Sequence, residues 1–482
     1  MAVFELLMQL LPQLELVILA FLVLGLDVFT SNRKAVVSGW TTVAGLIMAG
    51  VSTAYHMTAN PEPQLIWGEM LRLDQASGIF SILFIAGALL TVLFALDDEN
   101  LRTNGEFFFL IIISTLGLTM LAASSDLIMV FLALETVSIP LYILAGFINR
   151  DPRSVESGLK YMLFGAVASA IMLFGLTFLY GFAGTTHLYG MREAMLANDI
   201  PGTAIAGVVI FVMAGIGFKI SAVPFHFWVP DVYEGAPTVV SGFISTVSKA
   251  GGFAILLRLI STTFSLPGPF TLYLLVAMSV ASMLVGNLLA LNQKNFKRFL
   301  AYSSIAQAGY ILVGVAAFSP LGTTGVSYYL MAYLVTNLVA FAIAYQLARI
   351  TGSDDISTLA GLSQRSPLLG VALLVSLLSL GGIPPFAGFV GKLLVFSAGV
   401  QSGLEWLVVI AVLNSVVSLY YYLRIIKVAY LDKPWDESQL KIKNPVWIVT
   451  FSLCLIGILV MGVIIHPWFG WGTAVASSIL LH

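Results

Sequence analysis

Three lysines and one glutamate lie within long apolar stretches of this 482-residue sequence. Lys219, Lys249 and Lys392 occur in AGIGFKISAVPF, ISTVSKAGGFA and AGFVGKLLVF, and Glu135 occurs in MVFLALETVSIPL. A lysine at the centre of a membrane helix costs about 2.5–3.5 kcal/mol on insertion scales, so such residues usually serve a function. Burial disfavours the charged form of an amine and a nearby carboxylate favours it. The four residues are therefore candidates for gaining and losing protons.

Proton transfer between these groups requires a counter-charge and a polar path. We expect Glu135 to pair with Lys219, because it is a carboxylate deep in an apolar run of the first half of the chain. Protons would then pass to Lys249 and Lys392 through water held by polar side chains. The candidates for this lining are Ser138, Ser221, Ser248, Ser303, Gln307, Tyr310 and Asn337, with Ser245, Thr246, Ser304, Tyr333 and Thr336 as further members. Structural ion pairs, or hydroxyls bonded to backbone carbonyls, are the alternative interpretation.

The composition is that of a membrane protein. Hydrophobic residues make up 59% of the chain and charged residues 10%, against about 25% charged residues in soluble domains. The mean hydropathy is +0.98. These values exclude a cytosolic enzyme, a nucleic-acid binder and a disordered chain. We expect neither metal nor cofactor in this chain, because it has one cysteine, five scattered histidines and no phosphate-binding loop.

Fourteen apolar runs of helical length predict an all-α polytopic membrane protein. The runs lie at residues 4–29, 35–55, 76–96, 107–123, 127–147, 161–182, 204–231, 238–261, 271–291, 302–318, 325–349, 367–399, 405–426 and 445–465. The first run is too long for the apolar part of a cleavable signal peptide, and no basic residue precedes it. We therefore expect it to remain as a transmembrane helix.

The positions of the basic residues predict the orientation. Sixteen of the 22 basic residues fall in the odd-numbered connections, whereas the even-numbered connections carry only Arg72 and Arg192. Basic connections face the cytoplasm. We therefore expect both termini on the outer, periplasmic side of a bacterial inner membrane. The other four basic residues lie within runs, and Arg258 is close enough to the end of its run to extend its charged group to the membrane surface.

Two runs contain residues that break helices. Pro224 follows Lys219 by five residues, and the pair Pro384–Pro385 precedes Lys392 by seven. A proline inside a helix removes a hydrogen bond, and irregular backbone within a membrane survives where it lines a cavity or is buried in protein. Interrupted helices in corresponding positions of two halves are typical of inverted repeats. We predict residues 1–105 as helices 1–3, 106–262 as a first repeat, 263–430 as a second, inverted repeat, and 431–482 as helix 14 and a tail.

Two further features have structural interpretations. His226, in VPFHFW beside the first break, is predicted to anchor a loop rather than to relay protons. Tyr420, Tyr421 and Tyr422 resemble an aromatic belt at the membrane surface.

Four segments carry a family resemblance. DPRSVESGLKYMLFGA (151–166), GFKISAVPFHFWVPDVYEGAPT (217–238), NQKNFKRFLAYSSIAQAGY (292–310) and SLGGIPPFAGFVGK (379–392) resemble subunit N of NADH:quinone oxidoreductase, respiratory complex I. This antiporter-like family is related to Na⁺/H⁺ antiporter subunits. The resemblance implies 14 helices in two inverted five-helix repeats with helices 7 and 12 broken. It also implies ion-translocating roles for Glu135, Lys219, Lys249 and Lys392.

One position departs from the family. Gln307 stands where many relatives have a histidine, and because glutamine cannot titrate, a relay through this helix would have to pass through water. The lysine at 392 favours subunit N over a sister subunit that has an acid there.

The resemblance implies a proton-translocating subunit without a redox centre, within a complex I-type translocase. NADH, FMN, iron–sulfur clusters and quinone would be bound by partner subunits, and the other membrane-arm subunits, lipid and protons would be its partners. One alternative is a subunit of a stand-alone cation/proton antiporter. Another is a related complex that uses ferredoxin or another electron donor with a different quinone.

Overall fold

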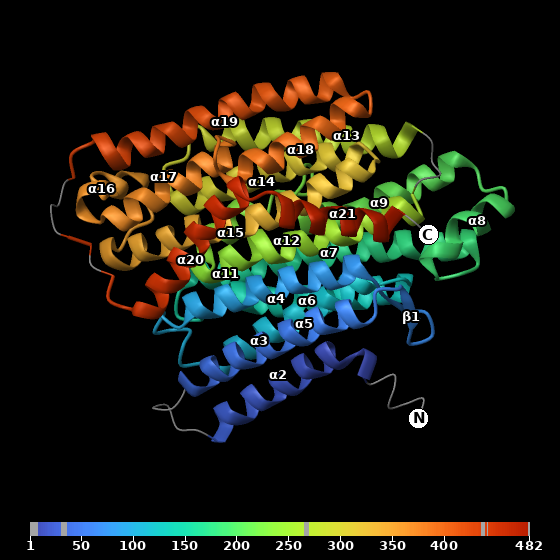
Figure 1. The fold of residues 1–482 in the computed structure, drawn as a ribbon, viewed down its shortest axis with the longest axis horizontal. Coiled ribbons are helices and arrows are strands. Elements are labelled where there is room, and N and C mark those ends of the chain that lie inside the picture. Colours follow the sequence, from blue (N-terminus) through green and yellow to red (C-terminus); the bar gives the residue numbers. More distant parts are fainter. Residues whose placement is uncertain (1–7, 30–35, 265–268, 435–438, 441, 481–482) are drawn as a thin grey trace.

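The computed structural model describes residues 8–29, 36–264, 269–434, 439–440 and 442–480, which form a bundle of helices lying roughly along one axis (Figure 1). The helices of the first part are α2 (Leu11–Phe29), α3 (Val36–Ala59), α4 (Gln75–Ala95), α5 (Gly105–Ala123), α6 (Leu127–Ala145), α7 (Pro152–Ala183), α8 (Leu188–Ala197) and α9 (Gly202–Ile220). Strands β1 (Gln64–Ile66) and β2 (Leu71–Leu73) form an antiparallel hairpin in which Leu65 is paired with Arg72.

The remaining elements continue the bundle. They are α10 (Val229–Gly235), α11 (Thr238–Phe243), the π-helical turn η2 (Ile244–Ser248), α12 (Lys249–Thr262), α13 (Pro269–Ala290), α14 (Phe296–Ala316), α15 (Pro320–Thr351), the 3₁₀ turn η3 (Ile356–Leu359), α16 (Leu362–Arg365), α17 (Pro367–Gly381), α18 (Ala387–Gln401), α19 (Glu405–Leu431), α20 (Pro445–Val463) and α21 (His466–Leu480).

The structure confirms the predicted set of spans. In the described part of the chain, 13 helical segments are long and apolar enough to cross a membrane, with α11, η2 and α12 forming one continuous segment. The fourteenth predicted span is divided between the shorter helices α17 and α18. Residues after the last predicted span form a further helix, α21. This helix packs against α4 and α15 and buries Val475 and Ile479.

Both predicted breaks are present. Helix α9 ends one residue after Lys219, Ser221 has a left-handed φ of 62°, and α10 begins only at Val229. Helix α17 ends at Gly381, Gly382 has a φ of 80°, and α18 begins at Ala387. Lys219 thus lies at the end of one half-helix, whereas Lys392 lies near the beginning of another. The peptide bonds before Pro224 and Pro385 are cis.

Local sequence signals explain where the helices begin. Asp126, Asp151, Asn295, Ser319 and Asn444 each accept a hydrogen bond from a backbone N–H of the following helix's first turn. Such caps satisfy amides that have no partner within the helix. Proline stands in the first turn of α7, α15, α17 and α20, where no backbone N–H is needed.

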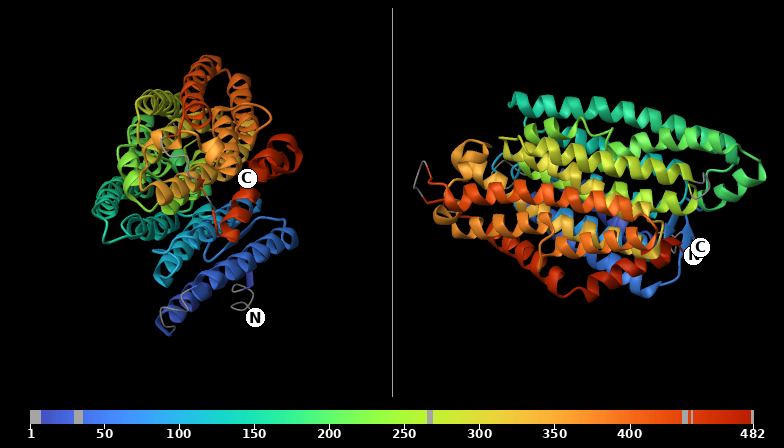
Figure 2. Two further views of the ribbon diagram at one scale, coloured as in Figure 1. Left: turned by 90° about the vertical axis from the view of Figure 1, so that its left-hand side faces the viewer. Right: turned by 90° about the horizontal axis from the view of Figure 1, so that it is seen from above.

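The helices that carry the candidate residues lie at the centre. The segment α11–η2–α12 and helices α14 and α15 are almost completely buried, whereas most residues of α2, α7 and α20 are partly buried or exposed. Figure 2 shows α2 and α3 as an outer row along one side of the bundle. The exposed apolar side chains are suited to lipid or neighbouring subunits, while the central helices provide a water-poor interior.

The beginning of α2 and the end of α21 lie at the same end of the bundle, near the β1–β2 hairpin (Figure 1). Gln9 donates to Gln64 of β1 at 3.2 Å, and Ser478 accepts from the backbone N–H of Ala76 at 3.4 Å. This arrangement agrees with an even number of crossings. At the opposite end, ion pairs join Arg298 to Asp231 at 2.7 Å and to Glu234 at 2.9 Å.

Candidate functional site

Lys219 points from the last turn of α9 toward α6. Its side chain is buried, with 4% exposed, and its Nζ donates to the Oγ of Ser138 at 3.0 Å. Ser138 in turn donates to the carbonyl of Leu134 at 2.7 Å. A hydroxyl can accept a hydrogen bond from an ammonium or donate one to a neutral amine. This contact therefore accommodates Lys219 with or without its proton.

The expected direct ion pair between Glu135 and Lys219 is not formed. No carboxylate oxygen of a described residue lies within the 4.0 Å ion-pair distance of Lys219, and Glu135 instead accepts from the Oγ of Ser169 on α7 at 2.6 Å. Ser138 lies one helical turn after Glu135, so the hydroxyl that contacts Lys219 and the carboxylate share one face of α6. Any electrostatic interaction between the carboxylate of Glu135 and the amine of Lys219 therefore acts across Ser138, without direct contact.

Lys249 is the first residue after the π-helical turn η2 and is completely buried. Its Nζ donates to the backbone carbonyl of Ser304 at 2.8 Å and to the Oγ of the same residue. Among the described residues no carboxylate forms an ion pair with it. π-Helical turns within α-helices occur frequently at functional sites because they displace side chains from the regular ladder. Here the turn directly precedes the amine.

The helices that carry Lys219 and Lys249 approach each other closely. A Cβ atom added at Gly252, one turn after Lys249, would lie 3.3 Å from the Cβ and Cγ of Lys219. The hydroxyls of Ser221 and Ser248, which neighbour the two lysines in sequence, are buried without a hydrogen-bond partner among the described residues. Buried hydroxyls of this kind are sites that a water molecule can satisfy.

A cluster of hydroxyl and amide groups continues from Lys249 along α14. The Oγ of Ser303 and the hydroxyl of Tyr422 are 2.6 Å apart, and Gln307 donates to the same hydroxyl at 3.2 Å and to the carbonyl of Leu380 at 3.0 Å. Tyr329 donates to the Oε1 of Gln307. Gln307 is therefore held on both ends of its amide.

Tyr422 was not predicted as part of the site. Tyr421 and Tyr422 are buried, whereas Tyr420 is 64% exposed, so the expected aromatic belt is wrong for two of its three members. On a helix, consecutive residues point about 100° apart and cannot all face the membrane surface. Hydropathy alone does not distinguish which of the three tyrosines faces inward.

Lys392 occupies the second break. Its Nζ lies 4.4 Å from the ring centroid of Tyr310, 3.3 Å from the carbonyl oxygen of Gly381 and 3.4 Å from the Oγ of Ser415. The side chain of Lys392 lies against Gly382. A Cβ atom added at Gly382 would be 2.8 Å from the Cδ of Lys392. A cation above an aromatic face is attracted to the ring. Tyr310 and the free carbonyl of the broken helix thus take the place of a counter-ion.

Some of the other predicted lining residues bond to side chains of neighbouring helices, and some bond to the backbone of their own helix. Asn337 donates to the Oγ of Ser245 at 2.8 Å and to the hydroxyl of Tyr333 at 3.0 Å, which joins α15 to the π-helical turn beside Lys249. Thr336 is within 3.1 Å of Ser379 on α17. The hydroxyl of Thr246 bonds to its own helix at Gly242, in agreement with the structural alternative. His226 is buried, and its Nδ1 has no partner among the described residues.

The Ser303–Tyr422–Gln307 cluster gives a stability prediction. We expect Tyr422→Phe to lower the free energy of unfolding by about 1–3 kcal/mol, because it leaves buried Ser303 without its partner. The thermal unfolding midpoint of the detergent-purified protein measures the effect. Tyr420→Phe on the same helix is the control, since its ring is exposed. Equal midpoints for the two variants would show that the cluster contributes nothing to stability.

Arg258 does not extend to the membrane surface as expected. It is 1% exposed, and its NH1 and NH2 each donate to one carboxylate oxygen of Asp74 at 3.1 Å. NH2 also donates to the carbonyl of Ala122 at 2.9 Å. A guanidinium suits this two-pronged geometry. The prediction was wrong because the sequence does not reveal that the beginning of α4 lies against α12.

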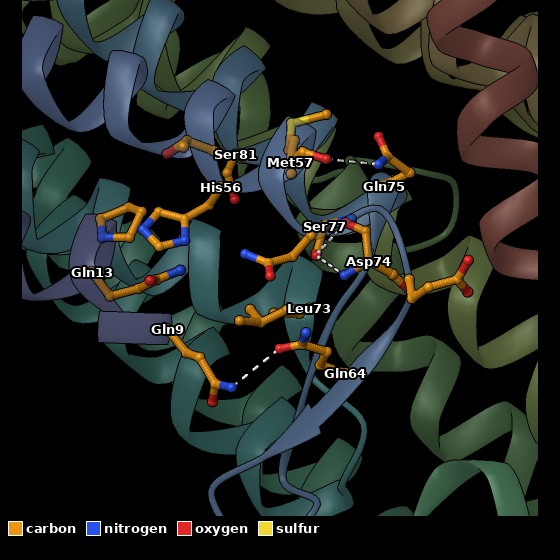
Figure 3. A pocket seen from close by; sticks show the side chains of 16 residues that line it. Gln9, Gln13, His56, Met57, Gln64, Leu73, Asp74, Gln75, Ser77 and Ser81 are labelled. Carbon is orange, nitrogen blue, oxygen red and sulfur yellow. Dashed lines mark hydrogen bonds between the residues drawn. The ribbon is translucent and has the colours of Figure 1, made fainter. Parts of the chain in front are cut away.

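Asp74 also borders a small polar pocket between the beginning of α2, the end of α3 and the beginning of α4 (Figure 3). The cavity is about 60 Å³, and Gln9, Gln13, His56 and Gln64 line it. None of the three buried lysines or Glu135 contributes to this pocket. The proton-transfer candidates therefore belong to the central helices, and the N-terminal helices form a separate polar region.

The chain matches known proteins over most of its length. The family described as NADH:quinone oxidoreductase/Mrp antiporter, TM, matches residues 124–418, which contain Glu135 and the three buried lysines. The NADH-quinone oxidoreductase subunit N of Heliobacterium modesticaldum is 42% identical over 91% of this chain and 92% of its own length. The NAD(P)H-quinone oxidoreductase subunit 2 of Trichormus variabilis is 40% identical over 90% of this chain and 84% of its own length.

A solved structure agrees with these relatives. A chain of the respiratory complex I from Thermus thermophilus with bound aureothin superimposes with a TM-score of 0.81 and 32% identity, covering 95% of this chain and 98% of that chain. The resemblance that the motifs predicted is confirmed by the family match, the relatives and the fold together. The chain therefore belongs to the NADH:quinone oxidoreductase/Mrp antiporter family of transmembrane subunits.

Proposed function

We propose that this chain is a proton-translocating subunit in the membrane arm of a complex I-type NADH:quinone oxidoreductase. It carries no redox centre, and NADH, FMN, iron–sulfur clusters and quinone are bound by partner subunits. Electron transfer in the partner subunits drives proton movement through this chain. The chain lies in a bacterial inner membrane with both termini on the periplasmic side, as its basic connections favour.

The observation that carries the proposal is the set of three buried lysines with neutral oxygen partners. Lys219 bonds to Ser138, Lys249 to Ser304, and Lys392 to Gly381 and Ser415. A carboxylate in contact would fix each lysine as an ammonium, whereas hydroxyl partners serve both protonation states. Each amine can thus bind a proton in one step and release it in another without losing its hydrogen-bonded position.

Glu135 regulates the first lysine in this proposal. The carboxylate and the amine are separated by Ser138 and are held on different helices, α6 and α9. A small relative movement of these helices changes the Coulomb energy between the charges, which is large in a water-poor interior. Bringing them together favours the protonated amine, and separating them favours proton release toward Lys249.

Water and hydroxyls complete the path to Lys392. Gln307 cannot titrate, and its amide is held by Tyr329, Tyr422 and Leu380. The proton therefore passes beside this side chain, through water near Ser303 and Tyr422, and not through the amide itself. The two halves, residues 106–262 and 263–430, act as inverted repeats that contribute Lys219 and Lys392 from their broken helices.

Lys219→Ala tests the role of the first lysine. We expect the complex to assemble, because apolar packing holds the fold, while proton transport falls strongly because a titrating group is lost. Transport is measured as dye quenching in proteoliposomes, together with electron transfer in the same sample. Lys443→Ala is the control, since Lys443 is exposed. An assembled Lys219→Ala complex that transports protons like the wild type would show that the relay assignment is wrong.

Purification from the native membrane in mild detergent tests the assembly. We expect flavin and iron–sulfur subunits to accompany the chain, with quinone-dependent NADH oxidation in the eluate. Such subunits without NADH activity would indicate a different electron donor. Small hydrophobic partners alone, with no redox activity, would identify an antiporter subunit, and the lysines would then belong to a cation-exchange path.

A further inference from the structure

A large cavity opens at the end of the bundle that carries most of the basic connections. Its volume is about 670 Å³, and it lies between the end of α13, the beginning of α14, η3 and the last turns of α19. Three basic residues line it: Lys294, Arg424 and Lys433. It is separate from Lys219, Lys249 and Lys392, none of which is part of its lining.

The basic groups of this cavity are available to an anion. All three are exposed, and no described acidic residue forms an ion pair with any of them. Arg424 donates through NH1 to the carbonyl of Leu291 at 3.0 Å, which fixes its guanidinium above the end of α13. Two acids also line the cavity. Asp355 accepts from the N–H of Ser357 at 2.8 Å and Asp432 follows the end of α19. Three basic and two acidic side chains leave the described lining with a net charge of +1.

The wall beneath the basic groups is apolar. Phe299, Tyr421 and Ile425 are buried side chains that line the cavity together with Leu291 and Val428. On the outer surfaces of α13 and α19, which pack side by side, apolar side chains are exposed toward the surroundings: Leu284, Leu288, Leu413, Val416 and Leu423. A basic rim above an apolar groove is complementary to a molecule with an anionic head and hydrocarbon chains.

The cavity lies at the end of a helix that is long enough to cross a bilayer. Helix α19 has 27 residues, and at about 1.5 Å per residue it is longer than the roughly 30 Å hydrocarbon core. Arg424 lies in the last third of this helix and Lys433 lies just beyond its end. Basic pockets between transmembrane helices on the cytoplasmic side are suited to the headgroups of anionic lipids.

We propose that this cavity binds an anionic phospholipid. Lys294, Arg424 and Lys433 hold the phosphodiester headgroup, and the acyl chains lie along the exposed apolar side chains of α13 and α19. A free phosphate would satisfy the basic rim but would leave the apolar wall uncovered, so the lipid is the better fit. The proposal requires only that the chain lies in a membrane and is independent of the proton-transfer assignment.

The lipid site is connected to Lys392 by three residues. Tyr421 lines the cavity and donates to the Oδ1 of Asn287 at 2.9 Å, and Asn287 donates to the hydroxyl of Tyr310 at 3.0 Å. The ring of Tyr310 lies beneath the amine of Lys392. A lipid that covers Tyr421 therefore stabilises the packing on which the position of Lys392 depends.

The test uses the full complex in detergent. Bound phospholipid is identified by native mass spectrometry, and affinity is measured by titration with phosphatidylglycerol, cardiolipin or phosphatidylcholine. We expect the two anionic lipids to bind and to raise the unfolding midpoint, whereas phosphatidylcholine and inorganic phosphate do neither. The triple variant Lys294→Gln, Arg424→Gln, Lys433→Gln should weaken anionic-lipid binding on the order of 100-fold.

Lys427→Gln is the matched control, because this residue is exposed on α19 but does not line the cavity. It should bind lipid like the wild type. Equal affinity of the wild type for anionic and zwitterionic lipid would overturn the proposal even if the triple variant failed to fold. A crosslink from position 424 to a neighbouring subunit in the assembled complex would also overturn it, because a protein partner would then occupy the cavity.

Discussion

Replacing Lys249 with methionine is expected to reduce proton transport by the assembled complex at least about 100-fold, the scale of a lost proton-transfer group. Lys249 is fully buried, its two hydrogen bonds both go to Ser304, and no described carboxylate pairs with it. Methionine preserves the length and apolar packing of the side chain but cannot carry a proton. Assembly should persist, because an apolar group of similar volume is tolerated at a buried charged position.

The measurement compares proton transport with electron transfer in the same proteoliposomes. Lys249→Arg separates charge from titration, since a guanidinium keeps its proton in proteins. We expect this variant to lose transport as well, provided that it assembles. Lys443→Met, at an exposed position, controls for the purification. Wild-type transport per electron in Lys249→Met would remove Lys249 from the proton path.

Asp74→Asn is expected to have the largest effect on stability. The side chain of Asp74 is fully buried and that of Arg258 is 2% exposed, and the two form a two-pronged ion pair. Removing one partner of a buried pair costs about 3–5 kcal/mol, because the other charge remains buried without compensation. We therefore expect poor assembly, measured as the yield of intact complex and its unfolding midpoint.

The double variant Asp74→Asn, Arg258→Met supplies the control for this prediction. It removes both charges of the buried pair and leaves Arg72 without its partner Asp74, and we expect it to recover part of the lost stability. A double variant no more stable than Asp74→Asn would show that the loss arises from Arg72, whose Nε lies 3.3 Å from the Oδ2 of Asp74, and not from the pair with Arg258. Asp74 also accepts from the N–H of Ser77 at 2.8 Å, and the side-chain oxygen of an asparagine can keep this cap.

The same pair predicts the behaviour in acid. Burial alone would raise the pKa of Asp74, but Arg258, with Arg72, holds it below the ordinary value of 3.8. A carboxyl with a lowered pKa contributes stability above its unfolded value and loses that contribution as the pH falls through the folded one. The wild type should thus keep this contribution at neutral pH and lose it only below pH 3.8, whereas Asp74→Asn should lack this component of the acid transition.

Features that depend on short stretches of chain were predicted correctly. The apolar runs gave the spans, because a bilayer requires each crossing to satisfy its own backbone hydrogen bonds. Pro224 and the pair Pro384–Pro385 located both breaks, because proline removes a backbone hydrogen bond and clashes with the preceding turn. Proline alone does not require a break, since α6 continues through Pro140. The buried lysines were recognised because charge within an apolar run is rare for energetic reasons.

Features that depend on contacts between distant helices were not predicted. The expected Glu135–Lys219 pair is replaced by contacts to Ser169 and Ser138. Arg258 forms a buried ion pair with Asp74, 184 residues away in sequence, although it was expected to reach the membrane surface. Tyr422 joins the hydroxyl cluster beside Gln307 although it was expected in a surface belt.

The sequence by itself determined that this protein is a bundle of transmembrane helices with titratable groups at two breaks and on one central helix, since hydropathy and proline chemistry act locally. Only the tertiary structure decided the partner of each group. Hydrogen bonds and ion pairs require contact within a few ångströms, and such contact is set by how the helices pack. This packing places neutral oxygen atoms beside Lys219, Lys249 and Lys392. It also places the carboxylate of Asp74 beside the guanidinium of Arg258.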